Sequence, residues 1–418
     1  MSLCRNYPTP SNRMAVMWSL MPIKNSVVLE YGPAGTTHFG AGFYGSFDVD
    51  LENSLFTTHI SEDDIIMGDV SRLEKAILEV DENYKPEVIF IVASAVVAVI
   101  GTDIKGVCTY MQDKVKAKLI CFDDGGFGGD YTMGIENTYT LFVKEFALPE
   151  NPVKNPDKYN ILGASAASYR IRSDIWEIKD LMKRSFNMEN GVILGLEAGI
   201  EDLKNMGGAA LNIVLRKEAL PAAKLLKEKF GTPYIYQCPY GYTGTLEWIN
   251  EMAEILSKEI NISFKKQLEE KIKDVRDMSR MMMATRMRMQ PTASIIGDYD
   301  IIIGLSNFCK EFGFIIDKKI CNHSLKNIDT ENENIVSYKK EKDKINDLKN
   351  IKGQLVFGDE ISIGICDNSN TKVCVSFPYP SKTQIATHLP FMGERYRLSY
   401  GDNKRILFKY EINLIKKR

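Results

Sequence analysis

Short apolar runs alternate with longer amphipathic stretches along most of this chain. The runs Val27–Leu29, 87–92 and Lys118–Phe122 are bounded by turn residues and are largely apolar, which predicts buried strands. A helix is expected from Ser71 to about Leu78, and Ser61 is expected to act as a helix N-cap. A strand followed by a helix, repeated many times, predicts an α/β fold with parallel sheets.

The same alternation continues toward the end of the chain. Further strands are expected at Tyr159–Gly163, Val192–Leu194, Ala210–Leu215, Tyr234–Tyr236, Ala293–Gly297, Gln354–Phe357, Ile361–Ile365 and Val373–Ser376. Further helices are expected near 103–115, from near Asp174, and over 219–230, 246–260, 263–283 and 302–312. The charged stretch Asn327–Asn350 is interpreted as a solvated helix face or a mobile insertion.

The run Val88–Gly101 is strongly apolar and superficially similar to a membrane span. It is shorter than the roughly 18 residues that a membrane helix needs, and it is crowded with β-branched residues after Pro86. It therefore predicts a buried parallel strand that leads into a helix.

The length of the chain and the positions of its prolines predict the domain organisation. At 418 residues, and with about 150 residues per domain, the chain is expected to hold three domains. Prolines at 149, 152 and 156 mark a linker. We predict an α/β protein of three Rossmann-like domains, each a mostly parallel sheet flanked by helices, over 1–155, 156–262 and 263–418.

Composition indicates where the protein is expected to be located and which classes of partner are not expected. A net charge of −2 and a pI near 6.2 give no electrostatic footprint for nucleic acid. The polar stretch Met1–Arg13 does not resemble a signal peptide, so we expect a reducing, cytoplasmic location and no membrane. The eight cysteines form no CxxC pair, which argues against a zinc ribbon. Burial as small hydrophobic residues is expected for Cys108, Cys121, Cys309, Cys366 and Cys374.

The first strand ends in a loop with candidate binding chemistry. Gly32 and Gly35 allow a sharp turn and a close approach of the backbone, and a helix is expected to start near Thr36. In an open parallel sheet, ligands collect beyond the carboxyl ends of the strands, where a helix N-terminus favours an anion or an electron-rich cluster. A loop of this kind also serves simply to connect a strand to a helix.

Familiar nucleotide motifs are missing. No G-x-G-x-x-G with an acidic residue about 20 positions later follows a strand, and no lysine follows the glycine-rich Gly125–Gly129 where a phosphate-binding loop needs one. Four histidines form no metal-ligand pattern. From these residues alone the function stays open.

Eight segments, however, occur in the order of a known family. They are Cys4–Pro8, Pro22–Gly35, Thr57–Gly68, Ser94–Asp103, Phe127–Gly134, Asn160–Gly163, Pro239–Thr245 and His388–Gly393. Together they resemble the landmarks of nitrogenase component 1 type oxidoreductases over nearly the whole chain. The cysteine and histidine that hold the nitrogenase catalytic cofactor have no counterpart, so the resemblance implies a divergent member and not a true dinitrogenase.

The resemblance also implies what happened to the cluster ligands. In the family, three cysteines per subunit hold an iron–sulfur cluster between subunits; here the matching positions are Cys4, Thr36 and Ala95. Hydroxyl and methyl groups do not replace thiolates on iron. Cys4 is thus the candidate for a single metal ligand to a [4Fe-4S]-type cluster shared at a subunit interface, or else an idle thiol near a frayed terminus.

The resemblance further suggests residues around a substrate. His38 is the candidate proton donor, because histidine is most easily poised near neutral pH. Thr36, Thr37, His59 and His388 are candidates for substrate binding. The alternative for each histidine is an ordinary loop residue.

These expectations lead to one function and two alternatives. The chain is expected to be a subunit of a nitrogenase-like two-component reductase, paired with a sister subunit or a second copy of itself. An ATP-hydrolysing iron protein would deliver the electrons, and the ATP would belong to that partner. The first alternative is a non-catalytic scaffold or structural subunit for assembly of a metal-cluster or tetrapyrrole cofactor. The second is a cluster-free protein that binds a small molecule.

Overall fold

The computed structural model describes residues 4–6, 9–38, 55–147, 152–165, 167–168, 171–196, 198–285, 291–326, 328, 333–375, 391–393, 396–400 and 406–410. The chain divides into two compact units. The first-sheet unit contains Pro10–Ala167 and Asn190–Tyr234, and the third-sheet unit contains Met1–Thr9, Ser168–Glu189 and Ile235–Arg418.

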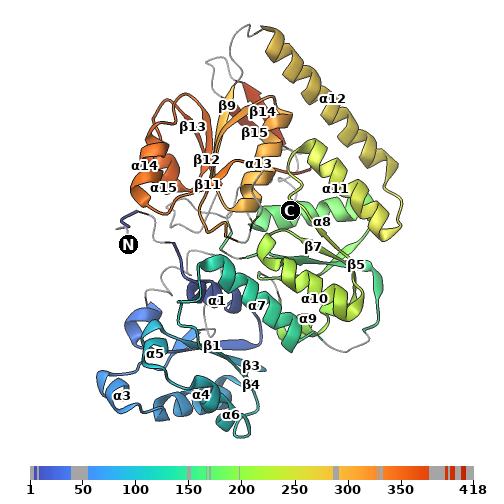
Figure 1. Cartoon of the computed structure of the whole chain (residues 1–418). Coiled ribbons are helices and arrows are strands. Elements are labelled where there is room, and N and C mark those ends of the chain that lie inside the picture. Colours follow the sequence, from blue (N-terminus) through green and yellow to red (C-terminus); the bar gives the residue numbers. More distant parts are fainter. Residues whose placement is uncertain are drawn as a thin grey trace. The chain divides into compact units, whose positions relative to one another are not determined.

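The first sheet contains β1 (Ser26–Tyr31), β2 (Leu55–Thr57), β3 (Val88–Ala93) and β4 (Lys118–Phe122). These strands are parallel and lie in the order β2-β1-β3-β4. Figure 1 labels β1, β3 and β4 of this sheet. The two central strands, β1 and β3, are buried along their whole length, as their apolar sequences predict. The helices of this region are α1 (Asn12–Leu20), α3 (Glu62–Met67), α4 (Ser71–Tyr84), α5 (Ala95–Ile100), α6 (Ile104–Gln112) and α7 (Tyr131–Glu145).

The second sheet has the order β6-β5-β7-β8, with β5 (Asn155–Leu162), β6 (Glu189–Leu194), β7 (Ala209–Val214) and β8 (Tyr234–Tyr236). Its central strands β5 and β7 are parallel. The helices that follow in sequence are α8 (Ile171–Phe186), α9 (Ile200–Lys204), α10 (Leu220–Phe230), α11 (Gly241–Leu256) and α12 (Ile262–Thr285), with short 3₁₀ turns at Met206–Gly208 and Lys217–Ala219.

The third sheet contains β9 (Thr292–Gly297), β10 (Ile315–Cys321), β11 (Ile335–Ser337), β12 (Leu355–Gly358) and β13 (Thr371–Cys374). All of its pairs are parallel, in the order β11-β10-β9-β12-β13. Its helices are α13 (Tyr299–Glu311), α14 (Glu341–Lys349) and α15 (Glu360–Ile365). A separate antiparallel pair is formed by β14 (Tyr396–Tyr400) and β15 (Ile406–Tyr410).

Each of these three sheets has one point where its strand order reverses. These points lie between β1 and β3, between β5 and β7, and between β9 and β12. Loops after the two strands diverge there, which leaves room for a ligand at the carboxyl edge. The fold therefore supplies three candidate edges.

The predicted α/β architecture, with parallel sheets flanked by helices, is confirmed. One local signal was also correct: Ser61 caps α3 in a reciprocal capping box with Asp64. Gly231 ends α10 at φ 68°. The run Val88–Gly101 forms β3 and α5, as predicted. The division into three domains at 155 and 262 stays a prediction.

Two local predictions were wrong. Ile361–Ile365 forms α15 and not a strand, because the Asp359 carboxylate accepts hydrogen bonds from the amide and hydroxyl of Ser362 and so starts a helix. Within 327–350, the described residues form β11, which pairs with β10, and α14. Lys344 of α14 is buried and donates to Asn322 at 2.9 Å, so this stretch is not simply a solvated face.

The cysteines follow the expectation only in part. Cys108, Cys309 and Cys366 are buried. Cys121 and Cys374 are half-buried, because each lies near the end of a strand at the edge of its sheet. A membrane-crossing helix is not found within the described ranges, since none of their helices is both long and apolar enough.

Candidate functional site

The loops after β1 and β3 meet at the carboxyl edge of the first sheet. A Cβ atom on Gly32 would lie 2.5 Å from the Cβ atom of Ser94, so only glycine fits there. Ser94 accepts a hydrogen bond from the Val97 amide and caps α5. Residues 34–38 are helical, which confirms the helix start expected near Thr36.

A buried carboxylate organises this edge. Glu30 is 1% exposed and forms an ion pair with Arg13 of α1. It also accepts hydrogen bonds from the hydroxyls of Thr36 at 2.8 Å and Thr37 at 2.7 Å. Arg13 donates from Nε to the Ala93 carbonyl at 2.9 Å, which ties α1 to β3. Thr36 and Thr37 therefore stabilise the loop, and their role toward a substrate stays a prediction.

Asp124 holds the glycine-dense loop after β4 in place. Its Oδ1 accepts from the Asn12 side-chain amide at 2.7 Å and from the backbone amides of Gly126 and Gly128 at 3.0 Å. Burial raises the pKa of this carboxyl, but the hydrogen bonds outweigh it and lower the pKa overall. Gly125, at φ 65°, lies so close to α5 that an added Cβ would sit 2.2 Å from a side-chain carbon.

The positions where the family has cysteines offer few iron ligands. The Thr36 hydroxyl is hydrogen-bonded to Glu30 and to the Pro33 carbonyl, and Ala95 presents an exposed methyl group. Cys4, in the third-sheet unit, is exposed. By donor chemistry, this chain alone therefore does not fit a complete cluster site.

Glu341 at the start of α14 anchors the segment that carries Cys4. Its two carboxylate oxygens accept from the backbone amides of Arg5 at 2.5 Å and Asn6 at 2.6 Å. Burial raises the pKa of Glu341, but these bonds and one from Cys4 outweigh it and lower the pKa. The Glu341 side chain thus helps to hold the described residues 4–6 against the rest of the third-sheet unit.

The histidines do not gather into one described site. His38 is exposed and is one of the helical residues 34–38. His59 is exposed with φ 53°, and its carbonyl accepts from Arg72 at 3.4 Å. His388 lies outside the described residues. The roles predicted for these three side chains, like that of Cys4, stay predictions.

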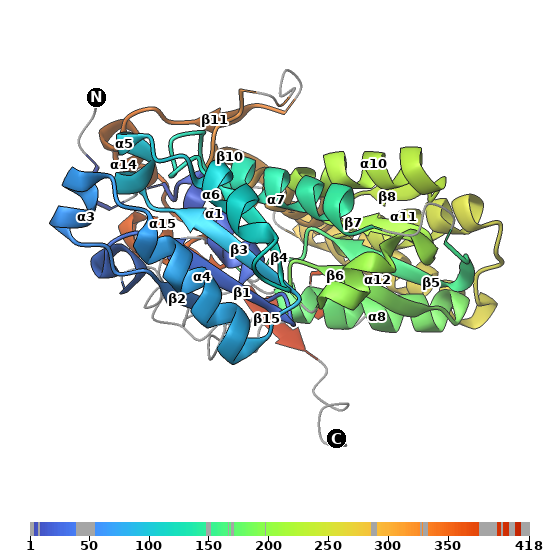
Figure 2. The same ribbon diagram turned by 90° about the horizontal axis from the view of Figure 1, so that it is seen from below.

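Sequence reasoning missed an exposed apolar surface at the first-sheet edge. We call it the apolar edge; its side chains and exposed fractions are Ile66 78%, Met67 79%, Val99 72%, Ile100 45% and Phe127 67%. These residues come from α3, α5 and the loop after β4, which follow β2, β3 and β4. Both views place α3 and α5 at one end of the sheet (Figures 1 and 2). The available signal was Ile66-Met67 at the end of a helix too short to bury them.

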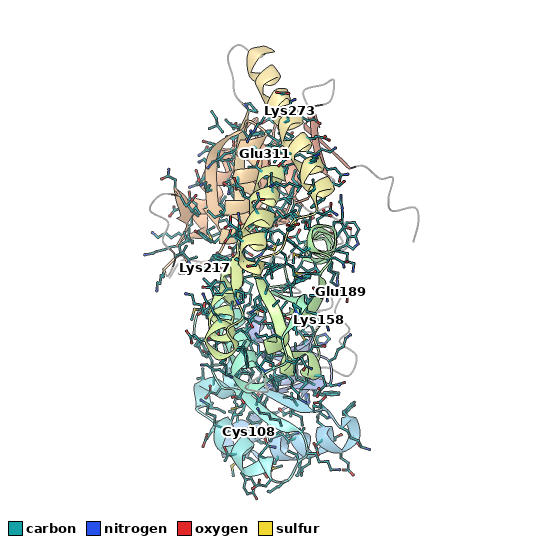
Figure 3. The ribbon with its side chains drawn as sticks, turned by 90° about the vertical axis from the view of Figure 1, so that its right-hand side faces the viewer. Cys108, Lys158, Glu189, Lys217, Lys273 and Glu311 are labelled. Atoms are coloured by element: carbon teal, nitrogen blue, oxygen red, sulfur yellow. The ribbon has the colours of Figure 1, made fainter. Side chains whose placement is uncertain are left out.

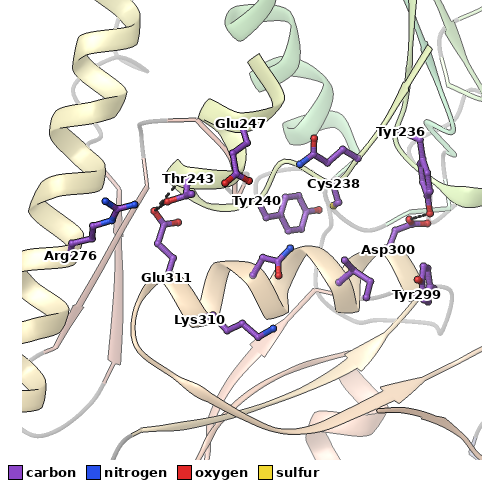
Figure 4. Close-up of a pocket in the computed structure, with 14 residues that line it drawn as sticks. Tyr236, Cys238, Tyr240, Thr243, Glu247, Arg276, Tyr299, Asp300, Lys310 and Glu311 are labelled. Carbon is purple, nitrogen blue, oxygen red and sulfur yellow. Dashed lines mark hydrogen bonds between the residues drawn. The ribbon is translucent and has the colours of Figure 1, made fainter. Parts of the chain in front are cut away.

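The third-sheet unit contains a pocket that was also not predicted. Its volume is about 700 Å³, and it lies between the loop after β8, the start of α11, α12 and α13 (Figure 4). The lining residues are Tyr236, Gln237, Cys238, Tyr240, Thr243, Gly244, Glu247, Arg276, Tyr299, Asp300, Ile303, Asn307, Lys310 and Glu311. Among the residues with described side chains, no group of three or more His, Cys, Asp or Glu could hold a metal ion.

Comparison with solved structures identifies the class of fold. The structure "Nitrogenase Cp1 at pH 6.5" superposes with a TM-score of 0.74 at 20% identity, over 94% of this chain and 91% of that one. The fold is therefore that of nitrogenase component 1.

The family model for nitrogenase component 1 type oxidoreductases matches residues 11–395, so the chain belongs to that family. A light-independent protochlorophyllide reductase subunit of Chlorobium phaeobacteroides (strain BS1) is 29% identical over 56% of this chain and 44% of its own length. The nitrogenase iron-molybdenum cofactor biosynthesis protein NifE of Clostridium pasteurianum is 28% identical over 61% of this chain and 56% of its own. The chain thus spans about half the length of the curated relatives it matches.

Proposed function

We propose that this chain is an electron-accepting subunit of a nitrogenase-like two-component reductase. The observation that carries the proposal is the apolar edge, which lies next to the first-sheet loops where the family places two of its cluster positions. Large apolar side chains that lie exposed on several loops and helices at the same end of one sheet are a candidate surface for a partner. The partner that fits this family is an iron protein that hydrolyses ATP.

The cluster would belong mainly to a second subunit. This chain offers one thiol, that of Cys4, at the three matched positions, because Thr36 and Ala95 supply no thiolate. A sister subunit would have to supply the remaining ligands, because a second copy of this chain would bring only its own Cys4 at the matched positions. A bound [4Fe-4S] cluster would provide one-electron transfer.

Introducing a charge into the apolar edge by substitution tests whether the iron protein docks there. The complex, purified anaerobically with its sister subunit, is mixed with iron protein and MgATP, and the concentration of iron protein at half-maximal electron transfer is measured. Met67→Asp and Val99→Asp should each raise it at least about tenfold, since covering a carboxylate with an apolar partner costs more than about 1.4 kcal/mol.

Tyr110→Asp is the matched control. Tyr110 is 60% exposed, but it lies near the end of α6, where Gln112 donates to the Ala117 carbonyl just before β4. It therefore lies toward the amino ends of the strands, and the substitution should leave electron transfer unchanged. Wild-type behaviour of both edge variants would show that no electron donor docks there. Separately, Cys4→Ala should alter the iron content and visible spectrum of the complex; an unchanged spectrum would remove Cys4 as a ligand.

A scaffold for cofactor assembly is the second candidate. It is favoured by the NifE relatives, whose name assigns them to iron-molybdenum cofactor biosynthesis, and by the thiolate-poor positions of this chain. A complex that carries metal but consumes no electrons with iron protein, MgATP and candidate substrates, and that passes the metal to an acceptor protein, would establish the scaffold.

A further inference from the structure

Helix α6 packs antiparallel against β4, the edge strand of the first sheet (Figure 1). Contacts at both ends of the helix fix this register. Lys105, near the start of α6, pairs with Asp123, just after β4, at 3.0 Å. Gln112, at the end of α6, accepts from the Leu119 amide at 2.9 Å and donates to the Ala117 carbonyl at 3.0 Å. The alignment of helix and strand is therefore defined along the whole of α6.

Two thiols meet between these contacts. Cys108 lies three residues after Lys105 on α6, and Cys121 lies two residues before Asp123 on β4, so both lie on the faces that the helix and strand turn toward each other. Cys121 packs against the buried apolar cluster that contains Cys108. The Cys108 thiol donates a hydrogen bond to the Cys121 sulfur. Figure 3 labels Cys108 in the first-sheet unit.

The two thiols differ in access and in acidity. Cys108 is 7% exposed, whereas Cys121 is half-buried, so a small reagent reaches Cys121 first. The hydrogen bond from Cys108 lowers the pKa of Cys121, and this effect, with the nearby Lys105 ammonium, outweighs burial and the Asp123 charge. Because the thiolate is the nucleophile in thiol–disulfide exchange, Cys121 is suited to attack and Cys108 to complete the exchange.

We propose that Cys108 and Cys121 form a redox site that low-molecular-weight disulfides oxidise to an intramolecular disulfide. The Cys121 thiolate attacks one sulfur of the disulfide RSSR and releases RS⁻, which leaves a mixed disulfide on Cys121. Cys108 loses its proton and attacks the Cys121 sulfur, and the second RS⁻ leaves. The two cysteines lose two electrons, RSSR gains them, and the two cysteine protons end on two RSH molecules.

The new bond requires a small movement of both side chains. Sulfur atoms in hydrogen-bond contact lie farther apart than the about 2.05 Å of a disulfide, so rotations about χ1 must close the gap. The bond would join α6 to β4 where they already pack, and it would hold that arrangement in place. Neither cysteine occupies a position matched to the family's cluster ligands, so this site does not depend on the proposed reductase function.

Treatment of the reduced full chain with glutathione disulfide tests this site. Free thiols are then blocked with N-ethylmaleimide in urea, and peptides from a digest without reductant are identified by mass spectrometry. The peptides of Cys108 and Cys121 should be joined, and lighter than the two reduced peptides by the mass of two hydrogen atoms. Glutathione on Cys121 should be at least about tenfold less abundant than this cross-link, because the neighbouring thiol displaces it within the molecule. Dithiothreitol should restore both thiols.

Alanine variants separate the roles of the two cysteines. Cys108→Ala should accumulate glutathione on Cys121, because the thiol that displaces it has been removed. Cys121→Ala should leave Cys108 reduced, because that thiol is buried. Cys374→Ala is the matched control, since Cys374 is also half-buried on an edge strand, β13 of the third sheet. This variant should form the cross-link like the wild type.

Exposed Cys4 reports that the oxidant has acted, and the concentration of glutathione disulfide is raised until Cys4 carries glutathione. A wild-type chain in which Cys108 and Cys121 then both carry N-ethylmaleimide would overturn the proposal. A mixed disulfide that persists on wild-type Cys121, without displacement by Cys108, would overturn it as well.

Discussion

Removing the guanidinium of Arg13 should strongly destabilise the first-sheet unit. The Glu30 side chain is 1% exposed and the Arg13 side chain 13% exposed, so the pair lies largely out of water. Arg13→Met would leave a buried carboxylate whose remaining donors, among the described residues, are the Thr36 and Thr37 hydroxyls at 2.8 and 2.7 Å. It would also remove the hydrogen bond to the Ala93 carbonyl. Breaking a buried ion pair costs about 3–5 kcal/mol; with two donors retained, we expect a loss of about 3 kcal/mol.

Urea denaturation followed by circular dichroism measures this change in the free energy of unfolding. The double variant Arg13→Met/Glu30→Leu removes both charges and should recover at least half of the loss. Arg72→Met is the control, because Arg72 is 44% exposed in its ion pair with Asp64 and should contribute less than about 1 kcal/mol. The reasoning is refuted if Arg13→Met costs no more than Arg72→Met.

Three further substitutions probe other contacts. Glu341→Ala should raise the alkylation rate of Cys4 by iodoacetamide at least about threefold, measured by mass spectrometry, because residues 4–6 lose their anchor; Glu360→Ala should not. Because hydrogen bonds lower the pKa of Glu341, its stabilisation is complete above about pH 4.5 and is lost as the pH falls through the lowered value. The unfolding free energies of wild type and Glu341→Gln should therefore converge in acid. Gly134→Ala should cost about 1–3 kcal/mol in urea denaturation, because its Cβ would lie 2.1 Å from the Asn12 carbonyl oxygen, whereas Gly364→Ala, with open space, should be neutral or stabilising.

Local chemistry accounts for the parts of the fold that the sequence predicts well. The run at 88–93 is apolar and β-branched almost throughout, so burial on both sheet faces explains it without tertiary information. Ile361–Ile365 has the alternation of a strand, yet it is a helix because Asp359 and Ser362 form a cap. Alternation over five residues is too short to outweigh a cap.

The candidate sites depend on contacts that no local pattern contains. The glycine-proline loop correctly predicted a helix start near Thr36, but not that Thr36 and Thr37 donate to Glu30. The same carboxylate also pairs with Arg13, which α1 brings to the strand end from 17 positions earlier in the chain. The pocket likewise joins Gln237 to Arg276 and Glu311, and only the packing of α11, α12 and α13 brings them together. Sequence motifs therefore indicated the edge of the first sheet as a candidate, and no motif indicated the pocket.

Docking of an electron donor at the apolar edge and ligation of a cluster by Cys4 are separate properties, and the two sets of variants test them independently. The apolar edge exposes Ile66, Met67 and Val99 by more than 70% each, so a partner that covered them would gain apolar burial. The proposal that this chain supplies one ligand to a shared iron–sulfur cluster rests instead on the single thiol of Cys4. If edge variants impair electron transfer while Cys4→Ala leaves the iron spectrum unchanged, the chain docks the electron donor but holds no metal. If Cys4→Ala changes the spectrum while edge variants act normally, the chain completes a cluster that receives its electrons elsewhere. This chain both docks the electron donor and supplies a cluster ligand only if the edge variants impair electron transfer and Cys4→Ala changes the iron spectrum.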